Sequence, residues 1–126
     1  GQPLEQAVAE LYHILSVAHQ QVVLIPCDAK AYGPIQLESA AQLRQLIELP
    51  GGGGTDMRAG IKTAMGLQPT ADCILVLTDG FTPYPAEIPN IPTLIGIIAP
   101  QNGEDRVSLP PSPPWGKDRV VVIPTS

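Results

Sequence analysis

Residues able to bind a metal ion or a phosphate lie in two short segments of the sequence. The first is GGGGTD, in which four glycines precede Thr55 and Asp56. The second is LTDG, which places Asp79 directly after an apolar run. Glycine loses more backbone freedom on folding than any other residue, so four in a row are costly to order. The run therefore indicates a place where a ligand or another backbone comes too close for side chains.

Two kinds of ligand suit such a loop. Glycine loops before helices bind phosphates through backbone N–H groups. The P-loop pattern, however, requires Gly-Lys-Ser/Thr, and a dinucleotide-binding loop directly follows a strand. Here no lysine follows the glycines, and a predicted helix precedes them. A hard cation fits better, because Mg²⁺ prefers oxygen ligands such as the hydroxyl of Thr55 and the carboxylate of Asp79.

The elements that must position these residues follow from hydrophobic spacing. Apolar residues at helical spacing predict helices over 3–20, 39–48 and 56–66. Ser39 and Gln42 have the form of a capping box at the start of the second helix. Continuous apolar runs predict buried strands over 22–28, 73–78, 93–98 and 119–123. A short edge strand is expected in PIQLES (34–39).

Helices alternating with fully apolar strands predict an α/β fold, with an open, mostly parallel, Rossmann-like sheet and helices on both faces. The 126 residues are expected to form a single domain. Ligands of such sheets bind at the carboxyl ends of the strands. Asp28 and Asp79 each fall at a predicted strand end, and the glycine loop precedes a helix at the same edge. Three distant segments are thus predicted to converge on one rim.

Each of these residues also has a purely structural interpretation. The glycines could form a flexible turn, and Thr55 could be the N-cap of its helix, which would not exclude ligand binding. Asp56 is expected in the first helical turn, where it complements the helix dipole. Asp79 with Gly80 could be an ordinary turn, but the matching glycine loop favours a ligand position. For Asp28 the structural role is favoured.

GGGGTD followed by a helix, and ILVLTDG at a strand end, resemble the von Willebrand factor A domain. More narrowly, the chain resembles the A-like domain at the C-terminal end of predicted metal-dependent peptidase proteins of bacteria, through LIPCDAKAY, GGGGTDMRAGI, LVLTDGFTPYP and PPWG. The resemblance covers nearly the whole chain. It implies a metal-ion-dependent adhesion site, in which Thr55 and Asp79 match two of three metal-binding loops. The open position of the metal would take a carboxylate from a partner protein.

The third loop of that family, Asp-x-Ser-x-Ser after the first strand, does not occur in this sequence. The chain opens on the helix that follows this strand in the family. We therefore expect an N-terminally incomplete domain, either because the sequence begins too late or because the strand is lost. The strands at 22–28 and 73–78 should then pair directly, unless another chain fills the gap. Mg²⁺ or Mn²⁺ is expected to bind weakly or not at all.

Composition narrows the function classes further. The net charge is −5 and the seven basic residues are scattered, so there is no basic stripe for nucleic acid. No apolar run is long enough to cross a bilayer. Cys27 and Cys73 lie in apolar runs and are expected to be buried free thiols of a cytoplasmic protein. Trp115 is expected to pack against the sheet edge.

These observations favour a non-enzymatic protein-interaction module. The alternative is an accessory domain of a metallopeptidase whose catalytic motif lies outside this chain, since the sequence contains no His-Glu-x-x-His. A second expectation is self-association through unpaired sheet edges. The partner protein is expected at the rim, which comprises the partial metal site and the flanking residues Gly51, Gly52, Gly53, Gly54, Asp56, Phe81 and Tyr84.

Overall fold

In the computed structural model of the chain, the residues described are 2–18, 21–27, 34–47, 56–78, 82–100 and 112–125. Helices and strands alternate along them, as the hydrophobic spacing predicts. Their order is α1 (Gln2–Ala18), β1 (Val22–Pro26), β2 (Ile35–Gln36), α2 (Ala40–Ile47), α3 (Met57–Met65), β3 (Cys73–Thr78), β4 (Thr93–Pro100) and β5 (Val120–Thr125).

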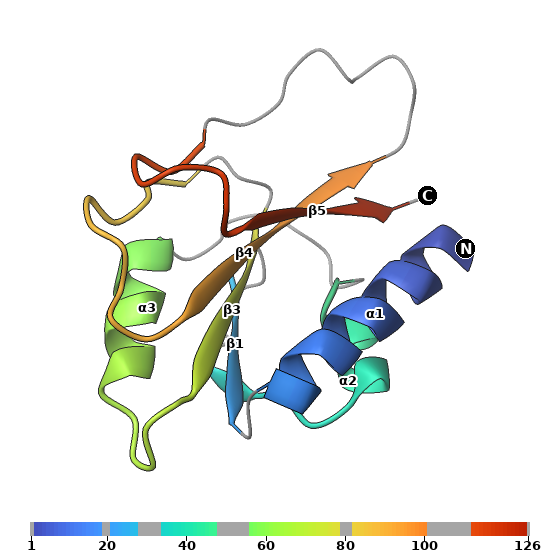
Figure 1. Cartoon of the computed structure of the whole chain (residues 1–126), viewed down its shortest axis with the longest axis horizontal. Coiled ribbons are helices and arrows are strands. Elements are labelled where there is room, and N and C mark those ends of the chain that lie inside the picture. Colours follow the sequence, from blue (N-terminus) through green and yellow to red (C-terminus); the bar gives the residue numbers. More distant parts are fainter. Residues whose placement is uncertain are drawn as a thin grey trace.

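The strands form one sheet in the order β2-β1-β3-β4-β5. The four longer strands run parallel to one another, and the two-residue strand β2 is antiparallel to β1. Helix α3 covers one face of the sheet, while α1 and α2 cover the other (Figure 1). The predicted α/β fold, with an open, mostly parallel sheet and helices on both faces, is confirmed.

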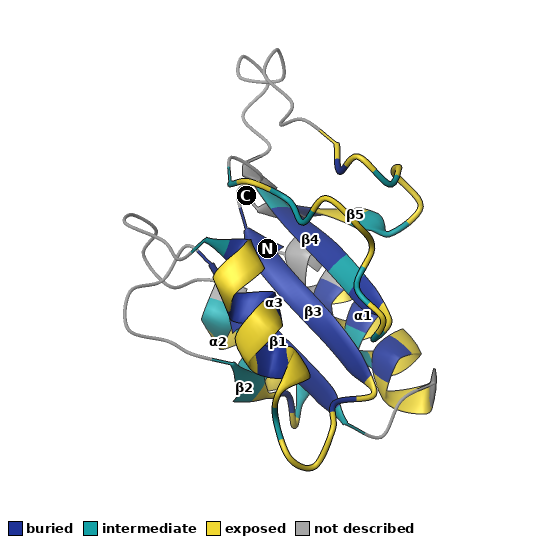
Figure 2. Ribbon diagram, turned by 90° about the vertical axis from the view of Figure 1, so that its left-hand side faces the viewer, coloured by how far each residue is buried: buried dark blue, intermediate teal, exposed yellow. Residues whose placement is uncertain are grey.

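Strands β1 and β3 pair directly. Their parallel register runs from Val22 opposite Cys73 to Pro26 opposite Leu77, and the Cys27 N–H extends it by donating to the Leu77 carbonyl at 2.8 Å. Every residue of both strands is buried (Figure 2). The prediction that these two strands close on each other without a strand between them is confirmed. Direct pairing satisfies the backbone groups that an empty lane would have left buried and unpaired.

Successive residues of a strand belong to two separate hydrophobic layers, because their side chains point alternately to the two faces of the sheet. In β1, Val22 and Leu24 face the layer under α1 and α2, whereas Val23 and Ile25 face the layer under α3. Gly60 lies where α3 meets this second layer, and a Cβ there would lie 2.6 Å from Ile25 Cγ2. Helix α3 therefore packs against β1 more closely than a side chain would allow.

The predicted capping box at α2 is present in part. The Gln42 N–H donates to Ser39 Oγ at 3.0 Å, so Ser39 is the N-cap. The Gln42 side chain, however, accepts from the backbone N–H of Glu38 at 2.7 Å, one residue earlier than a capping box requires. The two interactions still satisfy one free N–H at the helix start and fix the chain that leads into it.

The two cysteines are buried free thiols, as predicted. Burial raises the pKa of Cys73 to about 11, so its thiol is protonated at neutral pH. Among the helices of the described ranges, none is long and apolar enough to cross a membrane.

Candidate functional site

The predicted rim can be traced through its flanking residues. Asp56 follows Thr55 directly and precedes the first residue of α3, and Thr78, the last residue of β3, directly precedes Asp79. Asp56 and Tyr84 are described. The other predicted site residues lie outside the described ranges, namely Asp28, Gly51, Gly52, Gly53, Gly54, Thr55, Asp79 and Phe81.

A direct contact joins the start of α3 to the chain that follows β3. The backbone N–H of Met57 donates to Thr82 Oγ1 at 3.4 Å. Met57 lies two residues after Thr55, and Thr82 lies three residues after Asp79. The structure thus brings together the flanks of the two predicted metal-binding segments. The positions of Thr55 and Asp79 themselves stay a prediction.

The structure corrects the expected start of α3. Asp56, expected inside the first turn, is the N-cap: its φ of −61° and ψ of 122° are extended, and its Oδ1 accepts from the Arg58 N–H at 2.9 Å. The N-cap role considered for Thr55 therefore belongs to its neighbour. Both residue types cap helices well, and aspartate ranks slightly above threonine.

Asp56 is also paired with the guanidinium of Arg58. Arg58 Nη2 donates to Oδ2 at 2.7 Å, and Nε lies 3.1 and 3.2 Å from the two carboxylate oxygens. These side-chain hydrogen bonds lower the pKa of Asp56 below its usual value. The hydrogen bond from the backbone N–H of Arg58 lowers it further, by a smaller amount. The carboxylate is therefore ionised at neutral pH, and both of its oxygens already accept hydrogen bonds.

This arrangement does not suit Asp56 as a metal ligand. A cation at its oxygens would have to displace the guanidinium, whose positive charge would oppose binding. Within the described ranges, no group of three or more His, Cys, Asp or Glu side chains could hold a metal ion. Thr55 and Asp79, which offer a hydroxyl and a carboxylate, stay the predicted ligands of a hard cation.

Comparison with known proteins agrees with this fold. The family model of the VWA-like domain (DUF2201) matches residues 1–123. The chain belongs to this VWA-like family. A comparison with curated proteins found no match, and neither did a comparison with solved structures. The family match confirms the resemblance drawn from GGGGTD and ILVLTDG.

In this VWA-like domain, the segment after the rim is held in place by Trp115. The indole Nε1–H donates to the Pro85 carbonyl at 3.0 Å, and the Tyr84 ring meets the indole edge to face at a centroid distance of 6.4 Å. Both aromatic residues pack against the hydrophobic layer under α3. Trp115 therefore has a packing role, as expected, and the surface it packs against is the layer under α3. Burial also raises the pKa of Tyr84, whose hydroxyl has no hydrogen-bond partner among the described residues.

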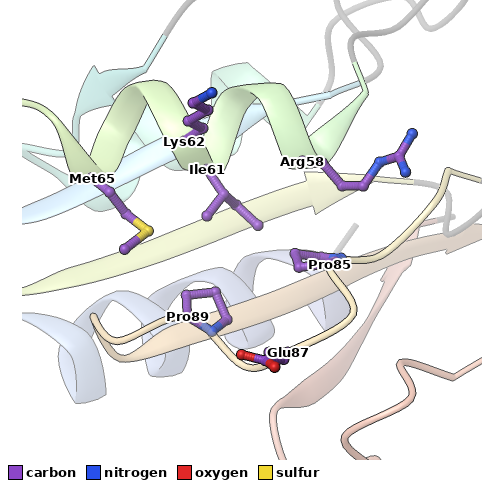
Figure 3. A pocket seen from close by; sticks show the side chains of 7 residues that line it. All are labelled: Arg58, Ile61, Lys62, Met65, Pro85, Glu87 and Pro89. Carbon is purple, nitrogen blue, oxygen red and sulfur yellow. The ribbon is translucent and has the colours of Figure 1, made fainter.

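The same segment forms one wall of a groove of about 450 Å³ beside α3. In Figure 3, Ile61 and Met65 point from α3 toward Pro85 and Pro89, and Arg58 lies at one end. Lys62 and Glu87 complete the lining. Sequence reasoning missed this groove, because two segments about 25 residues apart form it and neither has an unusual local pattern.

Proposed function

We propose that this VWA-like domain is a non-enzymatic protein-interaction module that binds a partner at the carboxyl-end rim of its sheet. The observation that carries this proposal is the contact between Met57 N and Thr82 Oγ1. It supports the convergence of the glycine loop and the Thr78–Asp79 strand end, which lie far apart in sequence. Ligands of open α/β sheets bind at this edge. The binding surface would include the glycines, Asp56 and the segment from Phe81 to Tyr84.

Within this proposal, the metal site is partial. Thr55 and Asp79 would hold Mg²⁺ or Mn²⁺, and the bound ion would offer an open position to a carboxylate of the partner. Affinity is expected to be weak or absent for two reasons. The sequence supplies no Asp-x-Ser-x-Ser loop, and the carboxylate of Asp56, which follows Thr55 in the sequence, is paired with Arg58. Mg²⁺ gives up its waters reluctantly and needs more oxygen ligands than two residues provide.

The absence of enzymatic activity is part of the same proposal. The sequence has no His-Glu-x-x-His and only two histidines, His13 and His19, spaced six apart. The thiol of Cys73 is buried and protonated, so it is a poor nucleophile. A role as accessory domain of a metallopeptidase is compatible with these residues, since the catalytic motif would then belong to another part of that protein.

We also propose that self-association through the sheet edge at β5 is weak. The Ile95 N–H donates to the Arg119 carbonyl, so the register turns the backbone groups of Val120, Val122 and Pro124 outward. The Val120 N–H already donates to the Lys117 carbonyl at 3.0 Å, and proline has no N–H. Along the described part of this edge, Val122 alone therefore offers an N–H to another strand.

Site-specific photo-cross-linking tests the interaction proposal. A photoreactive residue in place of exposed Pro83 is expected to capture a partner protein in cells of the source organism. The same residue at exposed Thr70, at the amino end of β3, is the matched control and should capture none. Equal capture from both positions would contradict a partner site at the rim.

A further inference from the structure

An apolar ridge with one acidic residue runs along the outer face of α1. It consists of Glu10, Ile14 and Val17, which are spaced i, i+4 and i+7 and therefore lie on one stripe of the helix. Ile14 is 64% exposed and Val17 is 73% exposed, and Glu10 is exposed as well. Neither apolar side chain contributes to the hydrophobic layer beneath α1, which is formed by other residues of the helix.

The groove beside α3 has the opposite shape, and Lys62 gives its α3 side one positive charge that is not paired with a described residue. Its floor is apolar, with Ile61 and Met65 facing Pro85 and Pro89 (Figure 3). Its α3 wall carries Arg58 and Lys62, and α3 contains no acidic residue. Among the described residues, Lys62 has no ion-pair partner, whereas Arg58 is paired with Asp56. The groove therefore suits an apolar ridge with an acidic side chain on the α3 side.

The groove is also preformed. The Trp115 Nε1–H bond to the Pro85 carbonyl fixes its loop wall from one side. The Met57 N–H bond to Thr82 Oγ1 ties the start of the same segment to α3. A surface that is already ordered loses less conformational freedom on binding, so a small contact can still be formed.

We propose that the groove binds the α1 ridge of a second copy of this chain. The lining residues of α3, from Arg58 to Met65, and the ridge, from Glu10 to Val17, each span eight residues of helix. With the two helices parallel, Glu10 of one copy lies between Arg58 and Lys62 of the other. Val17 then lies against Met65. Glu87 on the loop wall repels Glu10 and keeps the acidic side chain on the α3 side.

The position of the two surfaces determines the kind of assembly. Helices α1 and α3 cover opposite faces of the sheet (Figure 1), so a pair of copies leaves one ridge and one groove open. Such heterologous contacts add copies head to tail instead of closing a symmetric dimer. A contact of one helical ridge with one groove is small, so the association is weak and depends on concentration. It does not depend on the rim or on a metal ion.

Sedimentation velocity over a concentration series tests this proposal. The chain should shift from monomer to larger species as concentration rises. Lys62→Glu and Glu10→Lys should each lower the association constant about threefold, and the double variant should associate more tightly than either single variant. Val17→Ser should lower it about tenfold, because an apolar side chain is no longer buried.

Matched controls separate the groove from general effects of charge and hydrophobicity. Lys117→Glu reverses an exposed lysine outside the groove, and Val122→Ser removes an exposed valine from β5. Both should leave association unchanged, and circular dichroism should show that all variants fold. A chain that stays monomeric at every concentration overturns the proposal. So does a double variant that associates no better than the single ones. Neither outcome changes the result expected from photo-cross-linking at Pro83. Failure of the groove proposal can therefore be distinguished from failure of the proposed partner site at the rim.

Discussion

Gly60→Ala should destabilise this VWA-like domain, although the same change stabilises most helices. Gly60 is buried in α3, and a Cβ added to it would lie 2.6 Å from Ile25 Cγ2. Ile25 is only 2% exposed and belongs to the layer between α3 and β1. Its Cγ2 is attached to a branched Cβ, so it cannot move away without a change of χ1. Either Ile25 leaves its rotamer or α3 moves away from the sheet.

Two opposing contributions determine how much Gly60→Ala changes the free energy of unfolding. Replacing glycine by alanine inside a helix favours folding by about 1 kcal/mol. Forcing an extra carbon into a packed core costs roughly 1–3 kcal/mol. Because the contact distance is so short, we place the steric cost in the upper half of that range. The free energy of unfolding should therefore fall by about 1–2 kcal/mol.

Urea unfolding at equilibrium, followed by circular dichroism, measures this difference. The midpoint should fall while the slope stays unchanged, because the surface exposed on unfolding is the same. Ala59→Gly is the control, since Ala59 is the exposed neighbour in the same helix and its substitution measures the propensity term alone. A Gly60→Ala variant that is more stable than the parent would refute the close packing of α3 on β1.

Further substitutions and treatments test Asp56, Cys73 and Trp115. Asp56→Ala should lower stability by about 1 kcal/mol through loss of the N-cap, as measured by urea unfolding, and Asp56→Asn should keep most of it. Because hydrogen bonds from Arg58 lower the pKa of Asp56 below 3.8, its ionised form stabilises the fold above that pH. This contribution should fade as the pH falls through the lowered pKa. Cys73 should resist alkylation in the folded chain at pH 8, because its pKa is raised to about 11; fast alkylation without urea would contradict its burial. Its contribution to stability is present below pH 9.0 and should be lost as the pH rises toward 11. Trp115→Phe should cost about 1 kcal/mol, because it leaves the Pro85 carbonyl without its donor, and an unchanged urea midpoint would show that this hydrogen bond does not hold the loop.

The sheet could be predicted from the sequence because its strands are buried on both faces. A run such as CILVLT does not alternate polar and apolar residues as a half-exposed strand does, and all six residues are buried. The direct pairing of β1 with β3 followed from the cost of leaving buried backbone groups unpaired. Both features depend on residue type and local spacing, which the sequence contains in full.

Other features depend on contacts that local spacing does not encode. Thr55 and Asp56 are both good N-caps, so the sequence alone does not decide which of them begins α3. The pairing of Asp56 with Arg58, which occupies the carboxylate, also requires a side-chain geometry. The groove wall depends on the hydrogen bond from Trp115 to Pro85 across 30 residues. No pattern within either segment signals that bond.

Calorimetric titration of the 126-residue chain with Mg²⁺ and Mn²⁺ tests the proposed partial site most directly. We expect no measurable heat, or binding too weak to saturate at millimolar concentration, with no difference between the parent chain and Asp79→Ala. A dissociation constant in the low micromolar range that is lost in Thr55→Ala or Asp79→Ala would contradict it, because the site would then be complete in this chain.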